Sequence, residues 1–470
     1  MTTQHRRYAI VGTGGRSEMY LRALLDTHSD LGTVVAFVDT NDARMDYYAA
    51  LAAELGAAAP IARFTPAQLD GADGLFEAAR PDVLVVTSPD FTHADYIVAG
   101  LDRGLDVICE KPMTIDVASL RRIVEAEQRS SGTLVVTFNY RYSPRNTMVR
   151  RLIADGRIGD VTAVHFEWCL DTVHGADYFR RWHREKDKSG GLLVHKSTHH
   201  FDLVNWWIDD VPETVFALGG LRFYGRGNAE RRGLDPRPDL GRDLVDSGDP
   251  FALDLSADEK LSALFLTAEE HDGYLRDRDV FSDGITIEDT VTLAVGYRGG
   301  PSMSYSLVAN SPWEGYRVSI TGTEGRIELE VVERGWVSGE RTTSGLGPNG
   351  KSAPVVDPSI QADDDSAAEA LRPHGSRLVL QRLWEPPQLI EIPEGVGSHG
   401  GGDRMLLDDV FRGPGVDPLH RQAGYLDGIR SVIVGVSAND SLRSGTAVRA
   451  SEYGLPLVEN EVPAREAVRS

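Results

Sequence analysis

The sequence predicts an α/β protein in two parts: an N-terminal doubly wound parallel sheet and a C-terminal α+β domain with a large, mostly antiparallel open sheet. Three observations carry this prediction. Apolar, strand-like runs alternate with helix-like runs up to about residue 145. A glycine-rich turn follows the first of these strands. Beyond residue 160, strand-like runs follow one another across short glycine turns, a pattern typical of antiparallel hairpins.

The turn after the first strand has the composition of a dinucleotide-binding loop. Gly12-Thr13-Gly14-Gly15-Arg16 allows a tight turn and a close approach of backbone N–H groups to a pyrophosphate at a helix start. Ser17 replaces the third glycine of the full motif, so the turn alone is a weak signal. The next strand ends at Asp39. Its carboxylate can accept hydrogen bonds from both ribose hydroxyls of NAD and would repel the 2′-phosphate of NADP. We therefore expect a Rossmann domain that binds NAD, with NADP less favoured and kept open by the nearby Arg44.

The strand and helix alternation continues through the rest of the N-terminal third. Further strands are predicted over residues 80–90, 105–112 and 132–144. A parallel, doubly wound sheet binds its ligands at the carboxyl ends of the strands. We place the NAD-binding domain at residues 1–145 and the substrate and oligomerisation domain at residues 146–470.

The second domain combines hairpins with two segments that fit neither helix nor sheet. A helix and a strand over residues 151–171, several later strands and a closing helix over residues 427–448 predict the antiparallel sheet. The segments near residues 226–284 and 338–404 are interpreted as insertions, which in compact domains are usually lids or disordered. At the end of the second, residues 399–403 (HGGGD) are either a backbone cradle for a substrate or a turn before a helix capped by Asp403.

Composition excludes several classes of function. The formal net charge of −22 argues against binding nucleic acid, which needs a basic surface. We expect no membrane span, since there is no run of about 18 apolar residues. Two cysteines, Cys109 and Cys169, cannot form a disulfide framework, and the N-terminus has no signal-peptide pattern. These observations favour a reduced, cytoplasmic setting.

Three histidines, a lysine and an aspartate lie close together within residues 189–207. If residues 192–208 form one helix, His195, His199, Asp202 and Trp206 share a face that is free for a cleft, while an apolar stripe faces the core. Asp202 could then orient the His199 imidazole, whose ordinary pKa near 6.5 suits proton removal from a hydroxyl.

Other interpretations of this cluster remain open. Two histidines and an acid on one helix face also resemble half of a zinc site, but the chain lacks an H-E-x-x-H motif and a cysteine cluster, so we predict no metal. His200 is expected to pack or lie on the surface, and the paired tryptophans fit the core better than a ligand platform. Lys196 is either solvated or a second cation near the substrate.

Several motifs together resemble the Gfo/Idh/MocA oxidoreductases. Glu110-Lys111-Pro112 follows a predicted strand, downstream of the glycine turn and Asp39. Gly190-Gly191, His195, His199 and Asp202 match the spacing of a second family pattern, and residues 139–144 (NYRYSP) resemble the segment at the domain crossover. The resemblance covers the Rossmann half, the crossover helix and the core sheet strands, but neither insertion. It implies a Rossmann domain followed by an α/β domain on an open sheet, whose counterpart often mediates dimer or tetramer contacts.

The resemblance also implies residue roles. Lys111 would orient the substrate hydroxyl and assist proton removal beside the nicotinamide, His199 would be the general acid/base, and Pro112 would fix the loop of the lysine. His195 stands where the family usually has aspartate, a departure from its lysine–aspartate–histidine arrangement.

The predicted site has three groups of residues. The catalytic group is Lys111, His199 and His195. The cofactor-binding group is Gly12, Gly14, Gly15, Arg16, Asp39, Ser88, His93, Glu110 and Lys111. The substrate-binding group is Asp202, His200, Lys196, Arg141, Tyr142 and Trp182. The basic run over residues 178–188 either receives a carboxylated or sulfated sugar or forms surface salt bridges.

We therefore expect an NAD-dependent oxidoreductase that transfers a hydride between a hydroxyl carbon of a sugar, polyol or glycoside and nicotinamide. A small-molecule carbohydrate is the expected partner, and the protein is expected to form a homo-oligomer, a dimer or tetramer. One alternative is a redox-neutral, NAD-dependent glycoside hydrolase that works by oxidation, elimination, water addition and re-reduction. A less favoured alternative is a non-catalytic NAD-dependent sensor.

Overall fold

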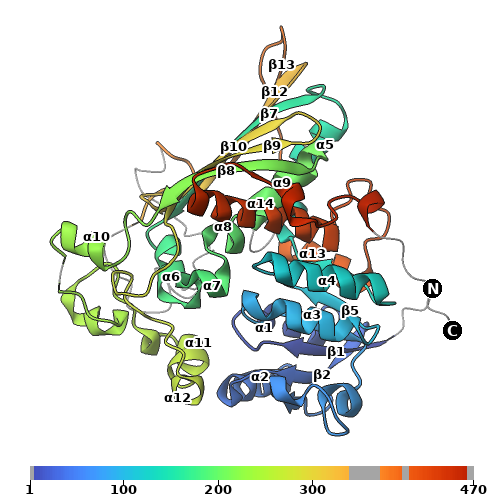
Figure 1. The fold of residues 1–470 in the computed structure, drawn as a ribbon. Coiled ribbons are helices and arrows are strands. Elements are labelled where there is room, and N and C mark those ends of the chain that lie inside the picture. The colour runs from blue at the N-terminus through green and yellow to red at the C-terminus, as the bar shows by residue number, and fades with distance from the viewer. Residues whose placement is uncertain (1–4, 235, 338–370, 394–401, 463–470) are drawn as a thin grey trace.

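The structure is a computed structural model that describes residues 5–234, 236–337, 371–393 and 402–462. It contains two sheets, a seven-stranded one below and a nine-stranded one above in the view of Figure 1. Both predicted sheets are therefore present. Within the described ranges, no helix is long and apolar enough to cross a membrane.

The seven-stranded sheet has the strand order β15-β6-β5-β4-β1-β2-β3 and is parallel except for β15. Its strands are β1 (Arg6–Val11), β2 (Gly32–Val38), β3 (Ala62–Phe64), β4 (Val83–Val86), β5 (Asp106–Cys109), β6 (Leu134–Val136) and β15 (Ala423–Gly424). The central strands are apolar on both faces because helices cover both faces. Tyr8 and Ile10 pack toward α1 (Ser17–Leu25) and α2 (Asp42–Glu54). Ala9 and Val11 pack toward α3 (His93–Leu101), α4 (Val117–Arg129) and α14 (Tyr425–Ser444).

One predicted strand is much shorter than expected. The prediction extended it over residues 132–144, but β6 ends at Val136 and residues Asn139–Tyr142 form a 3-10 turn, η4. The turn leads directly into α5 (Pro144–Ala154), whose first residue is the proline that the predicted strand would have had to include. Proline at the first helical position favours a helix start, so the chain leaves the sheet early.

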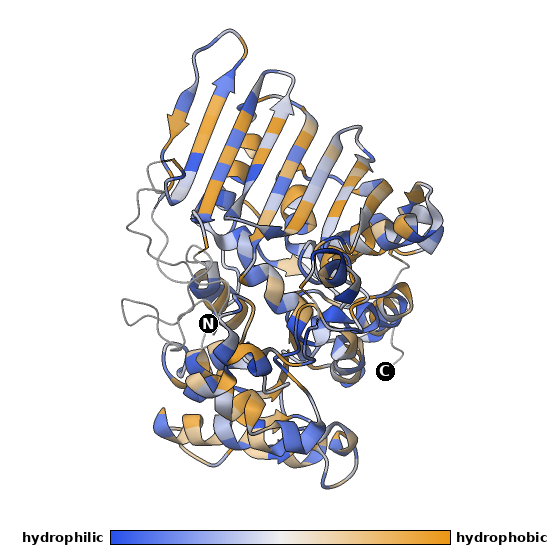
Figure 2. Cartoon of the chain, turned by 90° about the vertical axis from the view of Figure 1, so that its left-hand side faces the viewer, coloured by the Kyte–Doolittle hydropathy of each residue, from blue (hydrophilic) through white to orange (hydrophobic). Residues whose placement is uncertain are grey.

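The nine-stranded sheet has the order β14-β13-β12-β11-β7-β10-β9-β8-β16, with β7 and β10 as its single parallel pair. Its longer strands are β7 (Val161–Asp171), β8 (Pro212–Gly220), β9 (Thr290–Tyr297), β10 (Ser302–Ser311), β11 (Glu314–Gly322), β12 (Gly325–Arg334) and β13 (Gly375–Arg382). Its short edge strands are β14 (Gln388–Ile390) and β16 (Val448–Arg449). Apolar and polar residues alternate along these strands (Figure 2), so one face is buried beneath α5, α9 (Thr198–Ile208) and α14.

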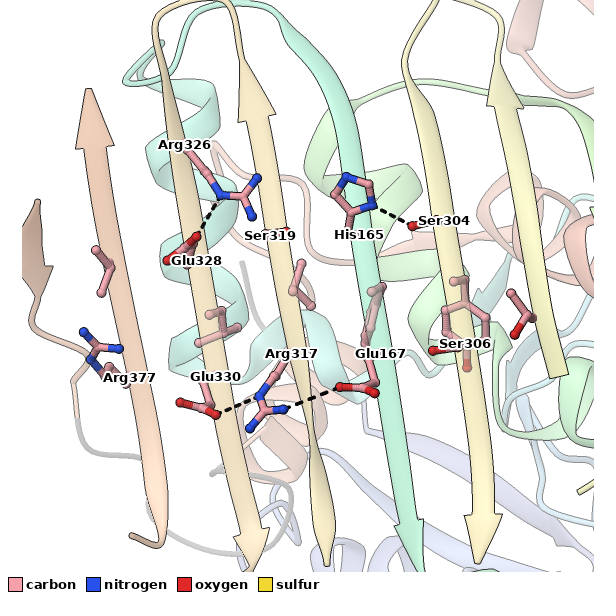
Figure 3. Close-up of a pocket in the computed structure, with 16 residues that line it drawn as sticks. His165, Glu167, Ser304, Ser306, Arg317, Ser319, Arg326, Glu328, Glu330 and Arg377 are labelled. Atoms are coloured by element: carbon pink, nitrogen blue, oxygen red, sulfur yellow. Dashed lines mark hydrogen bonds and ion pairs between the residues drawn. The ribbon is translucent and has the colours of Figure 1, made fainter. Parts of the chain in front are cut away.

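The other face of this sheet is open and polar. A hollow of about 480 Å³ lies on it, lined by residues of β7, β9, β10, β11, β12 and β13 (Figure 3). Arg317 pairs with Glu330 at 2.8 Å, and Arg326 pairs with Glu328 at 2.8 Å. The hollow shares no residue with the glycine turn, so it is separate from the dinucleotide site.

The two predicted insertions differ in character. Residues 226–284 form short helices, among them α10 (Arg226–Arg231), α11 (Glu259–Leu261) and α12 (Glu269–Asp272), and Figure 1 shows α11 and α12 beside α2. In the second segment, β13 and β14 extend the nine-stranded sheet, so this part is not an addition to the core. Residues 338–370 and 394–401 of that segment, including His399, Gly400 and Gly401, lie outside the described residues.

Candidate active site

A cleft of about 800 Å³ lies between the carboxyl edge of the parallel sheet and the histidine-rich helices below the large sheet. All nine residues predicted to bind the cofactor line it. So do Lys111, His195 and His199, together with Lys196 and Trp182 of the predicted substrate residues. The other four predicted substrate residues, Asp202, His200, Arg141 and Tyr142, do not line it.

The glycine turn leaves space for a dinucleotide. Gly12 has φ +88°, and a Cβ there would lie 2.5 Å from Ser88 Cα, so the position requires glycine. A Cβ on Gly14 or Gly15 would meet no heavy atom within 4 Å, because the turn opens onto the cleft at the N-terminal end of α1. These residues fit a pyrophosphate held by backbone N–H groups.

Asp39 directly follows β2, where a carboxylate that binds the ribose of the cofactor is expected. Its Oδ2 accepts hydrogen bonds from Thr13 N at 2.6 Å and Thr13 Oγ1 at 2.7 Å, which tie it to the glycine turn. Arg44, the residue that could receive a 2′-phosphate, instead forms an ion pair with Asp272 of the first insertion at 2.8 Å.

Glu110 and His93 support the turn and the lysine loop. Burial alone would raise the pKa of the Glu110 carboxyl, but Arg16 at 2.6 Å and Tyr20 at 2.7 Å hold it below its ordinary value. The two ring nitrogens of His93 lie 2.8 Å from Pro112 O and 2.7 Å from Ser88 O. His93 thus links the Ser88 loop to the loop that carries Lys111.

Lys111 lies in a buried polar group with Asp90 and His195, which come from two other segments of the chain. Burial lowers the pKa of its ammonium to about 8, with Asp90 and Glu110 opposing the shift. Its Nζ donates to His195 O at 3.3 Å. The His195 ring does not stand alone, because its Nδ1 lies 2.6 Å from Asp90 Oδ2. A carboxylate therefore does accompany the lysine and histidines, but it comes from the loop after β4 rather than from position 195.

Burial shifts the pKa values of the two side chains in this pair. Burial, and then the charges of Lys111 and Arg181, place the pKa of His195 well below its usual value. Burial also raises the pKa of Asp90 well above its usual value. Burial thus disfavours the charged form of both side chains, which lie 2.6 Å apart.

His199 is presented to the cleft by an aromatic wall. Its ring stacks on Tyr140 at 4.2 Å between centroids and 10° between planes. Lys196 Nζ donates to Tyr140 Oη at 3.2 Å and lies 4.7 Å from the centre of the Trp168 ring. Lys196 is 5% exposed, so the solvated interpretation is wrong and a second cation does lie beside Lys111.

The predicted single helix over residues 192–208 is wrong in one respect, because it breaks between α8 (Leu192–His195) and α9. Ser197 N donates to Leu192 O, five residues back, and the next helix starts at Thr198. The Ser197 hydroxyl lies 2.9 Å from Tyr305 Oη on the sheet, which anchors the break.

The prediction that Asp202 orients the His199 imidazole is wrong. Both of its oxygens accept from Arg141, at 2.6 and 2.8 Å, and both residues are almost fully buried. Arg141 also pairs with Asp427 of α14 at 3.0 Å. This cluster joins the crossover segment to two helices, and it leaves Asp202 unavailable to a metal shared with His195 and His199.

The remaining predicted substrate residues divide between core and cleft. His200 lies beneath the cleft wall, stacked on Trp168 at 4.1 Å, with Nδ1 2.8 Å from Tyr305 Oη. Tyr142 donates to Asp409 at 2.5 Å. Trp182 lines the cleft and stacks on His183 at 3.7 Å.

The basic run over residues 178–188 contributes to both the cleft and the surface. Arg181 and Lys188 line the cleft, although Arg181 pairs with Asp177 at 2.6 Å and Lys188 with Glu185 at 2.8 Å. Arg276 of the first insertion joins Asp177 from the other side at 2.7 Å. The run therefore supplies cations to the substrate end of the cleft and also forms salt bridges.

The polar and aromatic residues of the cleft that the predicted site did not include are led by Asp90, Tyr140, His183 and Arg276. Asp90 had a usable signal, since it follows a buried strand at the edge where ligands bind. Asp403 was considered only as a cap or a substrate contact. Its carboxylate reaches Asn139 Nδ2 at 2.6 Å and Arg16 at 3.3 Å, which brings it to the cofactor end of the cleft.

Comparisons with known proteins agree with this architecture. Residues 6–138 match the model described as the NAD-binding Rossmann fold of an oxidoreductase family, and residues 150–449 match the C-terminal alpha/beta domain of that family. The chain is 35% identical over 445 residues to YteT of Bacillus subtilis (strain 168), which is named as an oxidoreductase, with 89% of this chain and 91% of YteT covered. It is 31% identical over 149 residues to an inositol 2-dehydrogenase of Rhizobium meliloti (strain 1021), with 32% of this chain and 43% of that protein covered.

A solved structure resembles the fold over nearly the whole chain. The WlbA dehydrogenase from Bordetella pertussis, in complex with NADH and UDP-GlcNAcA, aligns with a TM-score of 0.59 and 16% identity. The alignment covers 97% of this chain and 100% of that one, and at this identity it bears on the fold alone. With both domain models matched in order along the chain, the protein belongs to the Gfo/Idh/MocA family of oxidoreductases.

Proposed function

We propose that the protein is an NAD-dependent oxidoreductase that transfers a hydride between a hydroxyl-bearing carbon of a sugar, polyol or glycoside and nicotinamide. The observation that carries the proposal is the shared cleft: the Lys111 ammonium and the His199 ring line the same space as the glycine turn and Asp39. Gly14, Gly15 and the start of α1 would hold the pyrophosphate of NAD, and Asp39 the ribose. When bound, NAD supplies the hydride acceptor.

The protein's own part in the reaction is proton transfer and orientation. The His199 imidazole takes the single proton of the substrate hydroxyl as the general base. Lys111 Nζ, whose pKa of about 8 leaves a useful neutral fraction near physiological pH, orients that hydroxyl and assists the removal of its proton. The Asp90–His195 pair fixes the carbonyl that Lys111 contacts. Trp182 and Tyr178 line the cleft and offer aromatic surface to a sugar.

A redox-neutral, NAD-dependent glycoside hydrolase is the second candidate. The first insertion favours it, since Leu261, Leu264 and Phe265 line the cleft near the nucleotide end, where they would cover a bound cofactor. The presence of both Lys111 and His199 in the cleft argues against a non-catalytic sensor.

One assay with two readouts tests these candidates. The protein is mixed with NAD and a panel of sugars, polyols and aryl glycosides, while NADH absorbance and aglycone release are followed together. NADH without aglycone release supports the dehydrogenase, and release without net NADH supports the hydrolase. Silence in both channels, with NADH binding intact, contradicts both.

The His199→Ala variant tests the assigned base. Turnover should fall by about 10²- to 10⁴-fold, since a general base contributes that much, while NADH binding persists. His165→Ala, on the open face of the large sheet, is the matched control and should keep full activity. Retained turnover in His199→Ala would remove His199 from the mechanism.

We also propose that the protein works in the cytoplasm as a homo-oligomer. Cys109 and Cys169 are both free and buried, which suits a reducing compartment. The open face of the large sheet carries equal numbers of acidic and basic residues in its hollow, Glu167, Glu328, Glu330, Arg317, Arg326 and Arg377. Such a surface can complement a second copy of itself.

A further inference from the structure

The first insertion is bound to α2 beside the end of the cleft that Asp39 marks. Asn41 Nδ2 donates to Ala268 O at 3.0 Å in a buried hydrogen bond. Arg44 Nε donates to Leu264 O at 3.1 Å, and its Nη1 lies 2.8 Å from Asp272 Oδ2. Each of these partners lies within residues 264–272, so this short stretch follows the surface of α2 closely.

The same stretch is anchored by an apolar side chain and by an ion pair to α1. Leu264 is fully buried, and it belongs to the apolar cluster that contains Met45 and Tyr48 of α2. Lys260 Nζ lies 2.5 Å from Glu18 Oε2 on α1, and both side chains are partly exposed at the rim of the cleft. The insertion thus touches both helices that follow the nucleotide-binding strands.

These contacts make the insertion a wall of the cleft. Lys260, Leu261, Leu264, Phe265 and Asp272 line it together with the glycine turn, Asp39 and Arg44. Asp39, the carboxylate expected to bind the adenosine ribose, identifies this end of the cleft as the adenosine end. The wall residues are mainly apolar, as a surface covering an adenine ring should be.

We propose that residues 259–272, here called the clasp, are part of the cofactor site and close over the adenosine half of NAD. The inference rests on the proposed function, since it takes the cleft to hold NAD. Bound dinucleotide can then leave only when the clasp releases α1 and α2, so exchange is slow.

A retained cofactor restricts the chemistry. The hydride taken from one hydroxyl carbon has to pass to a carbonyl carbon, of the same substrate or of a second one, before the next turnover. The clasp therefore favours carbohydrate substrates that are oxidised and reduced again on one protein molecule over a dehydrogenase that draws on free NAD.

The test is the rate at which NADH leaves the intact protein, followed by stopped-flow fluorescence after mixing with excess NAD. In Glu18→Lys, residue 18 repels Lys260 and should loosen the clasp, so release should be faster by about fivefold. A purely electrostatic effect has the opposite sign, because an added cation near the anionic cofactor would slow its release. The double variant Glu18→Lys/Lys260→Glu restores an opposite-charge pair and should return the rate toward that of the unchanged protein.

Asp102→Lys is the matched control, since it reverses one side of the exposed Asp102–Arg129 pair away from the cleft. Its release rate should equal that of the unchanged protein. Hydrogen exchange gives an independent readout: NADH should slow exchange at residues 259–272 and leave α10, at the other end of the insertion, unaffected. Unchanged or slower release from Glu18→Lys, with binding intact, overturns the clasp alone. A protein that binds no NADH overturns the proposed function and the clasp together.

Discussion

At the scale of single residues, the pKa of the Lys111 ammonium depends on burial and on the charged groups around it. Burial lowers its pKa to about 8, Asp90 and Glu110 act to raise it, and Lys196 lowers it further. Lys196 is itself buried against Tyr140 and Trp168, so it cannot move away into water. Burial and the second ammonium group therefore weaken the hold of Lys111 on its proton.

This arrangement predicts the pH dependence of oxidation. Lys111 assists removal of the hydroxyl proton in its neutral form, so kcat/KM should rise with pH through about 8. Lys196→Met removes a like charge and should raise the pKa of Lys111, which moves this limb to higher pH. A shift of half a pKa unit would reduce kcat/KM at pH 7 by about threefold.

The matched control for this experiment is Lys188→Met, which removes a more exposed lysine of the same cleft that pairs with Glu185. Its pH profile should keep the midpoint of the unchanged protein. A midpoint in Lys196→Met that stays in place, or moves to lower pH, would show that Lys196 does not tune Lys111.

Single residues also mark the limit of prediction from the sequence. Lys111, His199, the glycines and Asp39 could be predicted because each belongs to a short motif with fixed spacing. Asp90 lies 105 positions before its partner His195, and Tyr140 lies 59 positions before His199. No local sequence pattern therefore connects either pair. For Asp202 the local spacing was misleading. It lies three positions after His199 on the same helix, but both of its carboxylate oxygens accept hydrogen bonds from Arg141 of the crossover segment.

At the scale of elements, periodicity predicted the strands and helices well where they are long. The alternation of β9 to β12 and the helix α14 are present as expected. The break at Ser197 was not predictable, because it depends on a hydroxyl contact to Tyr305 on a strand more than a hundred residues away. The position of the first insertion likewise depends on long-range contacts with α1 and α2.

The clasp also bears on cofactor choice. Asp272 neutralises Arg44, the cation that could bind a 2′-phosphate, and adds a second carboxylate beside Asp39. In Asp272→Ala, Arg44 loses its nearest carboxylate but keeps its hydrogen bond to Leu264 O and lies 3.8 Å from Asp39. The preference for NADH over NADPH should therefore fall by about tenfold, the value of one charged hydrogen bond. The ratio of the two dissociation constants, from fluorescence titration, measures this.

Asp246→Ala is the control for this comparison, since Asp246 is an exposed acid of the same insertion that does not line the cleft. It should leave the ratio of dissociation constants unchanged. If Asp272→Ala keeps the full preference for NADH, then Asp39 alone selects the cofactor.

At the scale of the whole molecule, the two sheets divide the work. The parallel sheet and its insertion form the cofactor end of the cleft, and the buried face of the large sheet supports α9 and its histidines. The other face of the large sheet takes no part in this site (Figure 3). Phe216 and Leu218 of β8 are 38% and 63% exposed, which is unusual for large apolar side chains on a sheet.

These exposed residues, beside a hollow lined with charges of both signs, give the proposed self-association a test. Leu218→Glu places a carboxylate on the face and should shift the protein toward its 51.4 kDa monomer, because burying an unpaired charge opposes association. Sedimentation velocity over a range of concentrations measures the shift. Leu234→Glu, at a 42% exposed position in the first insertion, is the matched control and should leave the assembly intact. If the unchanged protein already sediments as a monomer at micromolar concentration, the open face serves another purpose. If the unchanged protein does associate, NADH release from dilute Leu218→Glu, compared with that of the unchanged protein, separates assembly from the clasp, since the clasp lies wholly within one chain.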